Sequence, residues 1–235
     1  MLVYLPYGGG ELHPNSAPSH GDGRANADND DGPHYLEVRI TLSNHDPCTS
    51  TLMPVPADIR TERLRLRPLQ RSDGPSLFAA IEESRRELDC WLNWPATLKT
   101  VVDVEQLCVR SRTKWDQRTE LRYGIFLGAN DRILGATGLH DINWEWRSFE
   151  VGYWLRTSAV GCGYAQEAVD ALVRMAFRNL HARRVALHCD PDNERSRQVA
   201  ERLGFVLEGR LRKETRTPAG LPRDTLIYAL IDDDV

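Results

Sequence analysis

Hydrophobic residues recur with helical or strand periodicity across residues 59–231, whereas residues 5–34 show no such pattern. The early segment is rich in Gly, Pro, Asn, Asp and Ser and poor in apolar residues. Because it cannot bury enough surface to offset the entropy lost on ordering, we expect it to be disordered. Next, YLEVRITL (35–42) alternates cleanly and favours an added edge strand.

The first part of the periodic region predicts a strand, helices and a β-hairpin. IRTERLRLRPL (59–69) is typical of a strand, and residues 71–92 predict one or two helices with Pro75 early in the first turn. Residues 100–117 place apolar side chains on one helical stripe. Two runs, 121–127 and 133–142, flank the turn GANDR and predict a hairpin.

The second part alternates strands and helices. We expect a strand over 147–158, a helix over 164–179, a strand over 183–190 and a helix over 193–204 that is closed by a glycine. Two closing strands follow, over 205–215 and 223–231. This order predicts an α/β fold with a mixed sheet. It places the glycine-rich stretch SAVGCGYAQEA (158–168) where a strand meets a helix.

Composition narrows the class of protein. The 235 residues are 41% hydrophobic and 27% charged, as in ordinary globular proteins. No apolar run approaches the roughly 20 residues needed to span a bilayer, and no secretory signal is evident. The five cysteines form no C-x-x-C pair and no zinc-like spacing with histidine. We therefore expect reduced thiols, a cytoplasmic location and no metal.

Charge is unevenly distributed. Residues 1–52 hold seven acidic side chains against two arginines, which leaves the remainder of this chain of net charge −4 nearly neutral. A neutral body gives no support to a nucleic-acid-binding platform. Met53 is followed by a short Pro-rich lead into the periodic region. We hypothesise that residues 53–235 form the functional domain and that residues 1–52 are an extension or a misassigned start.

The loop around Gly161 and Gly163 invites several interpretations. Backbone N–H groups and the helix dipole at such a turn suit a pyrophosphate, although many turns use glycine only for its backbone freedom. A dinucleotide fingerprint would need glycine where Gln166 stands, and the Gly-Lys-Ser/Thr of a P-loop is absent. A nucleophilic Cys162 would need a histidine base, and the nearest histidines show no signature.

Several motifs in order carry a family resemblance. EVGYWLRTSAVGCGYAQEAVDALV, followed about thirty residues on by DNERSRQVAERLGFVLEG, resembles the acyl-CoA-binding core of the GNAT N-acetyltransferases. The sequence is most similar to the Rim-type enzymes, which acetylate the N-termini of ribosomal proteins. The match covers about 59–231 and includes TERLRLRPL and WLNWP. It implies a twisted, mostly antiparallel mixed sheet of about seven strands flanked by helices, with an acyl-CoA cleft at the splayed central strands.

The resemblance also implies the cofactor-binding residues. The family's pyrophosphate loop, Q/R-x-x-G-x-G/A, falls on residues 160–165, where Val160 departs from the usual Gln or Arg and removes one side-chain contact. The backbone amides that cradle the phosphates remain. The implied set is Trp154, Leu155, Val160, Gly161, Cys162, Gly163, Tyr164, Ala165 and Asn193.

Catalytic and substrate roles follow from the same resemblance. In similar enzymes the Asn193 amide binds the pantetheine arm, and a hydroxyl, here Ser196, protonates the leaving thiolate. The local pattern alone favours a helix N-cap and a first-turn residue at these positions. Glu150 and Glu214 are candidate bases or, alternatively, solvated strand carboxylates. Two tryptophans, Trp91 and Trp94, are expected either to line the acceptor groove or to belong to the core. His140 and His188 receive no role.

These observations predict an acyl-CoA-dependent N-acyltransferase. Acetyl-CoA would be the co-substrate, and the N-terminal α-amine of a protein, such as a ribosomal protein, would attack it directly in a ternary complex. Three alternatives stay open: a small-molecule amine as acceptor, a larger acyl group, or a non-catalytic module that binds CoA or a protein. We expect a monomer or homodimer, with neither nucleic acid nor membrane as a partner.

Overall fold

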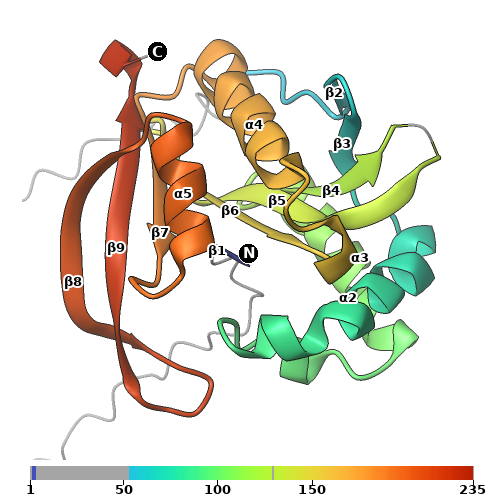
Figure 1. The fold of residues 1–235 in the computed structure, drawn as a ribbon. Coiled ribbons are helices and arrows are strands. Elements are labelled where there is room, and N and C mark those ends of the chain that lie inside the picture. The colour runs from blue at the N-terminus through green and yellow to red at the C-terminus, as the bar shows by residue number, and fades with distance from the viewer. Residues whose placement is uncertain (1, 4–52, 129, 235) are drawn as a thin grey trace, which may run out of the picture. The chain divides into compact units, whose positions relative to one another are not determined.

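The computed structural model describes residues 2–3, 53–128 and 130–234, all within one compact unit (Figure 1). The stretches predicted as a disordered segment and an edge strand, 5–34 and 35–42, lie outside the described residues. The helices are α2 (Gly74–Asp89), α3 (Val101–Asp116), α4 (Tyr164–Leu180) and α5 (Glu194–Arg202), with 3₁₀ turns η1 (Arg71–Asp73), η2 (Pro95–Thr97), η3 (Thr157–Ala159) and η4 (Asp232–Asp234).

Nine strands form a single sheet in the described part of the chain. Their order is β2-β3-β4-β5-β6-β7-β9-β8, and β1 adds to β6. The strands are β1 (Leu2–Val3), β2 (Ile59–Arg60), β3 (Leu64–Pro68), β4 (Leu121–Leu127), β5 (Arg132–Asn143), β6 (Ser148–Leu155), β7 (Arg184–Cys189), β8 (Val206–Arg216) and β9 (Pro222–Ile231).

The predicted α/β class and mixed sheet are confirmed, with one local difference. Residues 59–69 do not form one strand but two short antiparallel ones, β2 and β3. The Thr61 backbone N–H donates to the Leu64 carbonyl at 2.9 Å and closes a tight turn between them. The sheet exceeds the expected seven strands because the two-residue strands β1 and β2 add to it.

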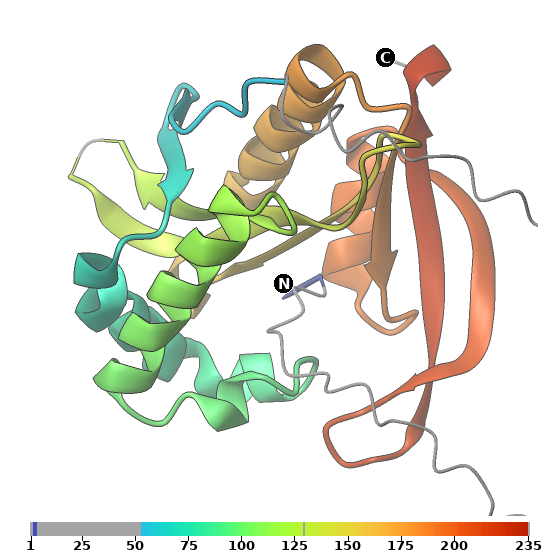
Figure 2. The same ribbon diagram turned by 180° about the vertical axis from the view of Figure 1, so that it is seen from behind.

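The helices cover both faces of the sheet. Helices α4 and α5 lie on one face, and α2 and α3 lie on the other (Figures 1 and 2). Strand β6 serves both layers: Val151, Tyr153 and Leu155 belong to the core that includes α4 and α5, whereas Trp154 packs into the second core with α2 and α3. Alternation along β6 therefore decides which side of the sheet each of its side chains faces.

Strands β6 and β7 separate after a short contact. They pair in parallel at Ser148–Glu150 with Arg184–Ala186, and every other pairing among the described strands is antiparallel. Beyond Glu150, β6 continues to Leu155 without β7 as a neighbour. Here β1 pairs with β6, with Leu2 opposite Trp154. The sheet thus opens at its centre, as the resemblance implied.

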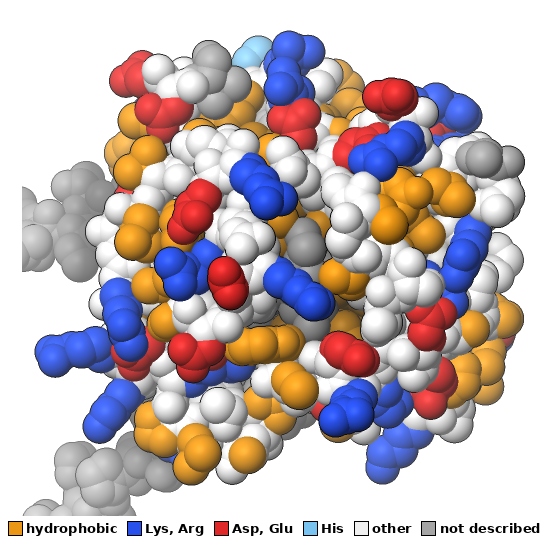
Figure 3. Space-filling view, viewed as in Figure 1, with side chains coloured by type: hydrophobic (Ala, Val, Ile, Leu, Met, Phe, Trp, Pro, Cys, Tyr) orange, Lys and Arg blue, Asp and Glu red, His pale blue; other side chains and the backbone are white. Residues whose placement is uncertain are grey.

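The surface carries mixed charge. Positive and negative side chains alternate over the face seen in Figure 3, without a large area of one sign. Within the described segments, no helix combines the length and the apolar character that crossing a membrane requires.

Candidate active site

The glycine-rich loop lies between β6 and α4, as predicted. Gly161 has φ +85° and Gly163 has φ +79°, a left-handed backbone that residues with a side chain adopt at a cost. Gly163 is the N-cap of α4, so the first N–H groups of this 17-residue helix point toward the loop. Two left-handed glycines before a helix N-terminus present backbone donors at its positive end, which fits a pyrophosphate.

Arg63, which the sequence analysis did not single out, fastens this loop to the sheet. Its guanidinium donates to the Cys162 carbonyl at 2.9 Å and pairs with Glu167 in the first turn of α4 at 2.6 Å. It also lies over the Tyr164 ring, 4.6 Å from the centroid. The sequence could not predict that Arg63 holds the loop, because its partners lie about 100 residues further along the chain.

Two other loop residues have clear local roles. The partly buried Val160 side chain packs against the main core, so this position contributes packing where the family usually has Gln or Arg. Cys162 is exposed and free, and its carbonyl, not its sulfur, holds Arg63. The loop therefore offers a ligand mainly its backbone.

Asn193 and Ser196 lie at the start of α5. The Ser196 backbone N–H donates to the Asn193 side-chain oxygen at 3.2 Å, so Asn193 is the N-cap that the local pattern favoured. Ser196 is fully buried, and its side chain lies beside that of Tyr153 on β6. Burial raises the pKa of Tyr153, which keeps the phenol neutral. Ser196 thus faces β6 from the α5 side, whereas Asn193 reaches the cavity described next.

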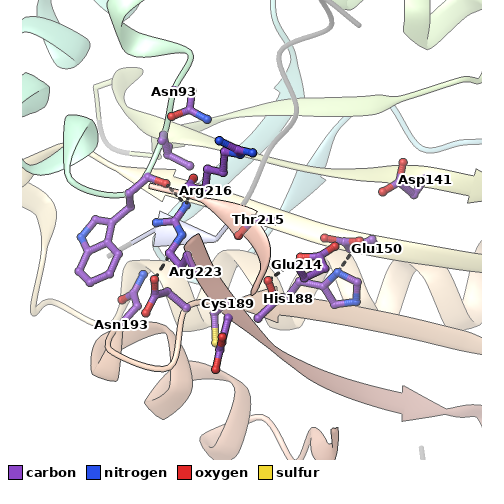
Figure 4. A pocket seen from close by; sticks show the side chains of 15 residues that line it. Asn93, Asp141, Glu150, His188, Cys189, Asn193, Glu214, Thr215, Arg216 and Arg223 are labelled. Atoms are coloured by element: carbon purple, nitrogen blue, oxygen red, sulfur yellow. Dashed lines mark hydrogen bonds and ion pairs between the residues drawn. The ribbon is translucent and has the colours of Figure 1, made fainter. Parts of the chain in front are cut away.

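A cavity of about 360 Å³ opens on the opposite side of the sheet. It brings together residues from β5, β6, β7, β8, β9, the loop before α5 and the segment after α2 (Figure 4). Both predicted base candidates, Glu150 and Glu214, line it, as do Asn193 and Trp91. The remaining lining residues are Leu92, Asn93, Asp141, His188, Cys189, Asp190, Thr215, Arg216, Arg223, Asp224 and Thr225.

The two tryptophans predicted to line the acceptor groove lie in different environments. Trp91 is partly exposed at the cavity, whereas Trp94 is 6% exposed and packs in the core against Trp154, with ring centroids 5.8 Å apart. The structure therefore places Trp94 in the core alternative and leaves only Trp91 at the cavity. The reason is local: Trp94 precedes the turn η2 and faces inward beneath α2.

Glu150 is the centre of a buried polar cluster. His140 lies directly opposite it on β5, with Nε2 3.9 Å from Oε1, and His188 on β7 brings Nδ1 to 3.1 Å from Oε2. The His140 Nδ1 atom is in turn 3.5 Å from the Asp141 carboxylate, and this contact lowers the pKa of Asp141. Neither histidine was assigned a role from sequence, because single histidines on strands have no diagnostic spacing.

The same cluster contains the side chains best placed to share a cation among the described residues. The ligand atoms of His140, Asp141 and Glu150 lie within 4.8 Å of one another.

Glu214 reaches the cavity through a β-bulge. The register between β8 and β9 shifts between Leu211 and Thr215, and Lys213 within the bulge has φ +54°. The Lys213 N–H donates to Asp224 at 2.8 Å, which fixes the bulge, and the Glu214 carboxylate accepts from the Thr225 hydroxyl at 2.6 Å. Bulges commonly re-aim side chains beside active sites. No pattern in the sequence predicts this bulge.

The fold and site together define a class of protein: an α/β protein whose diverging central strands lead from a glycine-rich loop at a helix N-terminus to a carboxylate-lined cavity. Residues 63–206 match the model of the acetyltransferase (GNAT) domain, and the chain belongs to the GNAT acetyltransferase family. The expected family and type of enzyme are thereby confirmed.

Three similar proteins illustrate the relationship. The ribosomal-protein-serine acetyltransferase of Escherichia coli is 29% identical over 173 residues, which cover 74% of this chain and 95% of that protein. The solved structure of RimL, a ribosomal-protein alpha-N-acetyltransferase in complex with coenzyme A, superposes with a TM-score of 0.70 at 24% identity and covers 77% of this chain and 99% of that one. The microcin C7 self-immunity acetyltransferase MccE, solved with acetyl-CoA and AMP, gives a TM-score of 0.68 at 23% identity, covering 73% and 93%.

Proposed function

We propose that this protein transfers an acetyl group from acetyl-CoA to a primary amine, and that the amine is the N-terminal α-amine of a protein, first of all a ribosomal protein. One observation carries the proposal: the part of β6 that β7 leaves runs from the cavity that holds Glu150 and Glu214 to the glycine loop. The E. coli relative, named for its action on a ribosomal protein, supports the choice of acceptor.

The cofactor would bind along the loop and the open strand edge. Backbone N–H groups of residues 161–165 would hold the pyrophosphate, because the two left-handed glycines turn the backbone toward it. The backbone edge of β6 around Trp154 and Leu155, which β1 borders in place of β7, would pair with the amides of the pantetheine arm and stabilise the oxyanion once β1 is displaced. Asn193, which lines the cavity, would meet the arm from the α5 side.

The two faces of the sheet divide the chemistry. Ser196, on the α5 side, would protonate the leaving thiolate. Glu150 and Glu214, on the cavity side, would promote, directly or through a bridging group, loss of the proton that the acceptor ammonium must give up before its nitrogen can attack the thioester carbonyl. An α-amine has a pKa of about 8, so only modest assistance is needed near neutral pH.

Release of CoA from acetyl-CoA in the presence of short peptides that begin with Ser or Ala tests the proposal. We expect turnover that saturates in both substrates. Ser196→Ala should lower kcat more than acetyl-CoA affinity, and an unchanged kcat would remove Ser196 from the mechanism. Absence of turnover across peptide and amine panels, with acetyl-CoA bound, would instead favour a non-catalytic CoA-binding module.

The cavity favours a second candidate, a cationic small-molecule amine. Five carboxylates line it, and only Asp190 and Asp224 are paired with arginine, through Arg223 and Arg210. A polyamine such as spermidine would satisfy the remaining negative charge. The experiment is the same assay with spermidine and an aminoglycoside beside the peptides; a higher kcat/KM for these than for any peptide would favour this candidate. Propionyl- and succinyl-CoA test the acyl group in parallel.

A further inference from the structure

Strand geometry places His188 with the carboxylates of Glu150 and Glu214 and on the face of the sheet away from α4. Along β7, Val185, Leu187 and Cys189 pack in the core that includes α4, so His188 faces the other side of the sheet. Glu150 faces the same side from β6, since it lies on the same face as Trp154. In Figure 4 the His188 ring lies beside the carboxylates of Glu150 and Glu214.

Within the pair of His188 and Glu150, the imidazole is the more accessible group. The His188 side chain is 30% exposed, whereas that of Glu150 is 8% exposed. The Glu150 carboxylate is enclosed by His140 on one side and His188 on the other. An amine that enters the cavity therefore reaches the imidazole more readily than the carboxylate behind it.

The contact also fixes the tautomer. The Nδ1 atom of His188 lies 3.1 Å from Glu150 Oε2, so in the neutral ring Nδ1 carries the hydrogen and donates it to the carboxylate. The lone pair is then on Nε2. A base whose second nitrogen is held by a carboxylate is the arrangement that serves proton abstraction in many hydrolases and transferases.

We propose that His188 is the catalytic base and that Glu150 is the positioning residue that holds it. This inference rests on the proposed acyl transfer. The acceptor ammonium gives one proton to His188 Nε2, and its lone pair forms the C–N bond as the C–S bond of the thioester breaks. The nitrogen then loses a second proton, which balances the proton taken up by the thiolate, and the imidazolium returns its proton to water.

The electrostatic surroundings agree with this role. Burial lowers the pKa of His188, but the hydrogen bond and charge of Glu150, with the charges of Glu214 and Asp141, outweigh burial and hold the pKa above its ordinary value. His140 contacts Glu150 from β5, and Asp190, Arg216, Arg223 and Asp224 line the same cavity. A base whose pKa lies above the ordinary imidazole value is closer in pKa to an α-amine than a carboxylate is.

The test is the pH dependence of kcat/KM for acetyl transfer to a Ser-starting peptide. In the wild type we expect kcat/KM to rise through an apparent pKa above 6.5, in addition to the titration of the amine. His188→Gln should remove this step and lower kcat/KM about 10²–10⁴-fold, while the acetyl-CoA Kd changes less than about twofold. Glu150→Gln should move the step to lower pH. His181→Asn, at the exposed end of α4, is the matched control and should change neither.

Chemical rescue separates catalysis from structure. In His188→Ala, added imidazole should restore a measurable part of the rate in proportion to its concentration, which a packing role would not produce. A His188→Gln enzyme that keeps kcat/KM within about threefold and retains the same pH step would overturn the proposal, as would His188→Ala that binds acetyl-CoA but is not rescued. Failure of the proposed function looks different, because the wild type would then show no turnover.

Discussion

Gly163→Ala is the sharpest test of the proposed pyrophosphate site. The residue has φ +79°, and an added Cβ would lie 3.4 Å from Arg63 Nη2, a tight but tolerable contact with the end of a flexible side chain. The main penalty is therefore conformational: a left-handed backbone costs an L-residue about 1–2 kcal/mol. Alanine either keeps this conformation, which lowers stability, or relaxes in the free protein, which lowers acetyl-CoA affinity.

The free energies lost from folding stability and from acetyl-CoA binding should add to about 1–2 kcal/mol. The reason is that the alanine loop is strained either in both the free and the bound protein or only in the bound protein. Lost entirely from binding, this energy weakens acetyl-CoA about 5–30-fold; lost entirely from stability, it lowers Tm by about 2–8 °C. Isothermal titration calorimetry measures the part lost from acetyl-CoA binding, and thermal melting with and without acetyl-CoA measures the part lost from stability.

A second left-handed glycine provides the control. Gly220, in the turn between β8 and β9, has φ +83°, and nothing lies within 4 Å of its added Cβ. Gly220→Ala should lower Tm by a similar amount and leave acetyl-CoA affinity unchanged, since Gly220 lines neither the cavity nor the surface pocket that Gly163 shares with the end of α5. The reasoning about the loop is refuted if Gly163→Ala changes neither Tm nor affinity, or if both variants weaken acetyl-CoA equally.

Four further changes have distinct expected outcomes. Trp94→Ala should destabilise the fold by about 3–5 kcal/mol in urea unfolding, because its indole is buried in the core. Trp91→Ala, at the cavity, should instead raise the acceptor KM and leave stability nearly unchanged. The hydrogen bond from Arg156 lowers the pKa of Glu83 to about 2. Since this folded-state pKa lies below the unfolded value, the ion pair stabilises the fold fully above about pH 4.5, and this stabilisation is lost as pH falls toward 2. Glu83→Gln should therefore flatten the acid side of a curve of Tm against pH. An unchanged slope would contradict this assignment. Deletion of residues 1–52 should tighten acetyl-CoA binding, measured by calorimetry, because β1 pairs with the edge of β6 that the pantetheine arm would use; equal affinity in the two proteins would show that β1 does not compete.

Periodicity was sufficient to predict most of the fold. The apolar spacing in α3 and α4 matches their buried faces, and Gly204 closes α5 as its position after the helix predicted. The break between β2 and β3 escaped prediction because Thr61 turns the chain within a run whose alternation is otherwise continuous. Local pattern does not report such a side-chain-assisted turn.

The site was predictable only where sequence neighbours form it. The glycine loop is contiguous, so its position and backbone could be expected. The cavity depends on contacts between distant segments: Arg63 reaches the loop from the turn before β3, and His188 meets Glu150 because β6 and β7 are parallel neighbours. Trp91 and Trp94 differ only in which way each faces around the end of α2. These are properties of packing, which one sequence does not display.

Steady-state kinetics on the full-length protein tests the central claim most directly. Initial rates of CoA release are measured over a matrix of acetyl-CoA and Ser-starting peptide concentrations, with mass spectrometry of the peptide. Direct transfer through a ternary complex predicts intersecting double-reciprocal lines and one acetyl group on the peptide α-amine. Acetyl-CoA binding without any acetylated product, from peptides or small amines, would contradict the account.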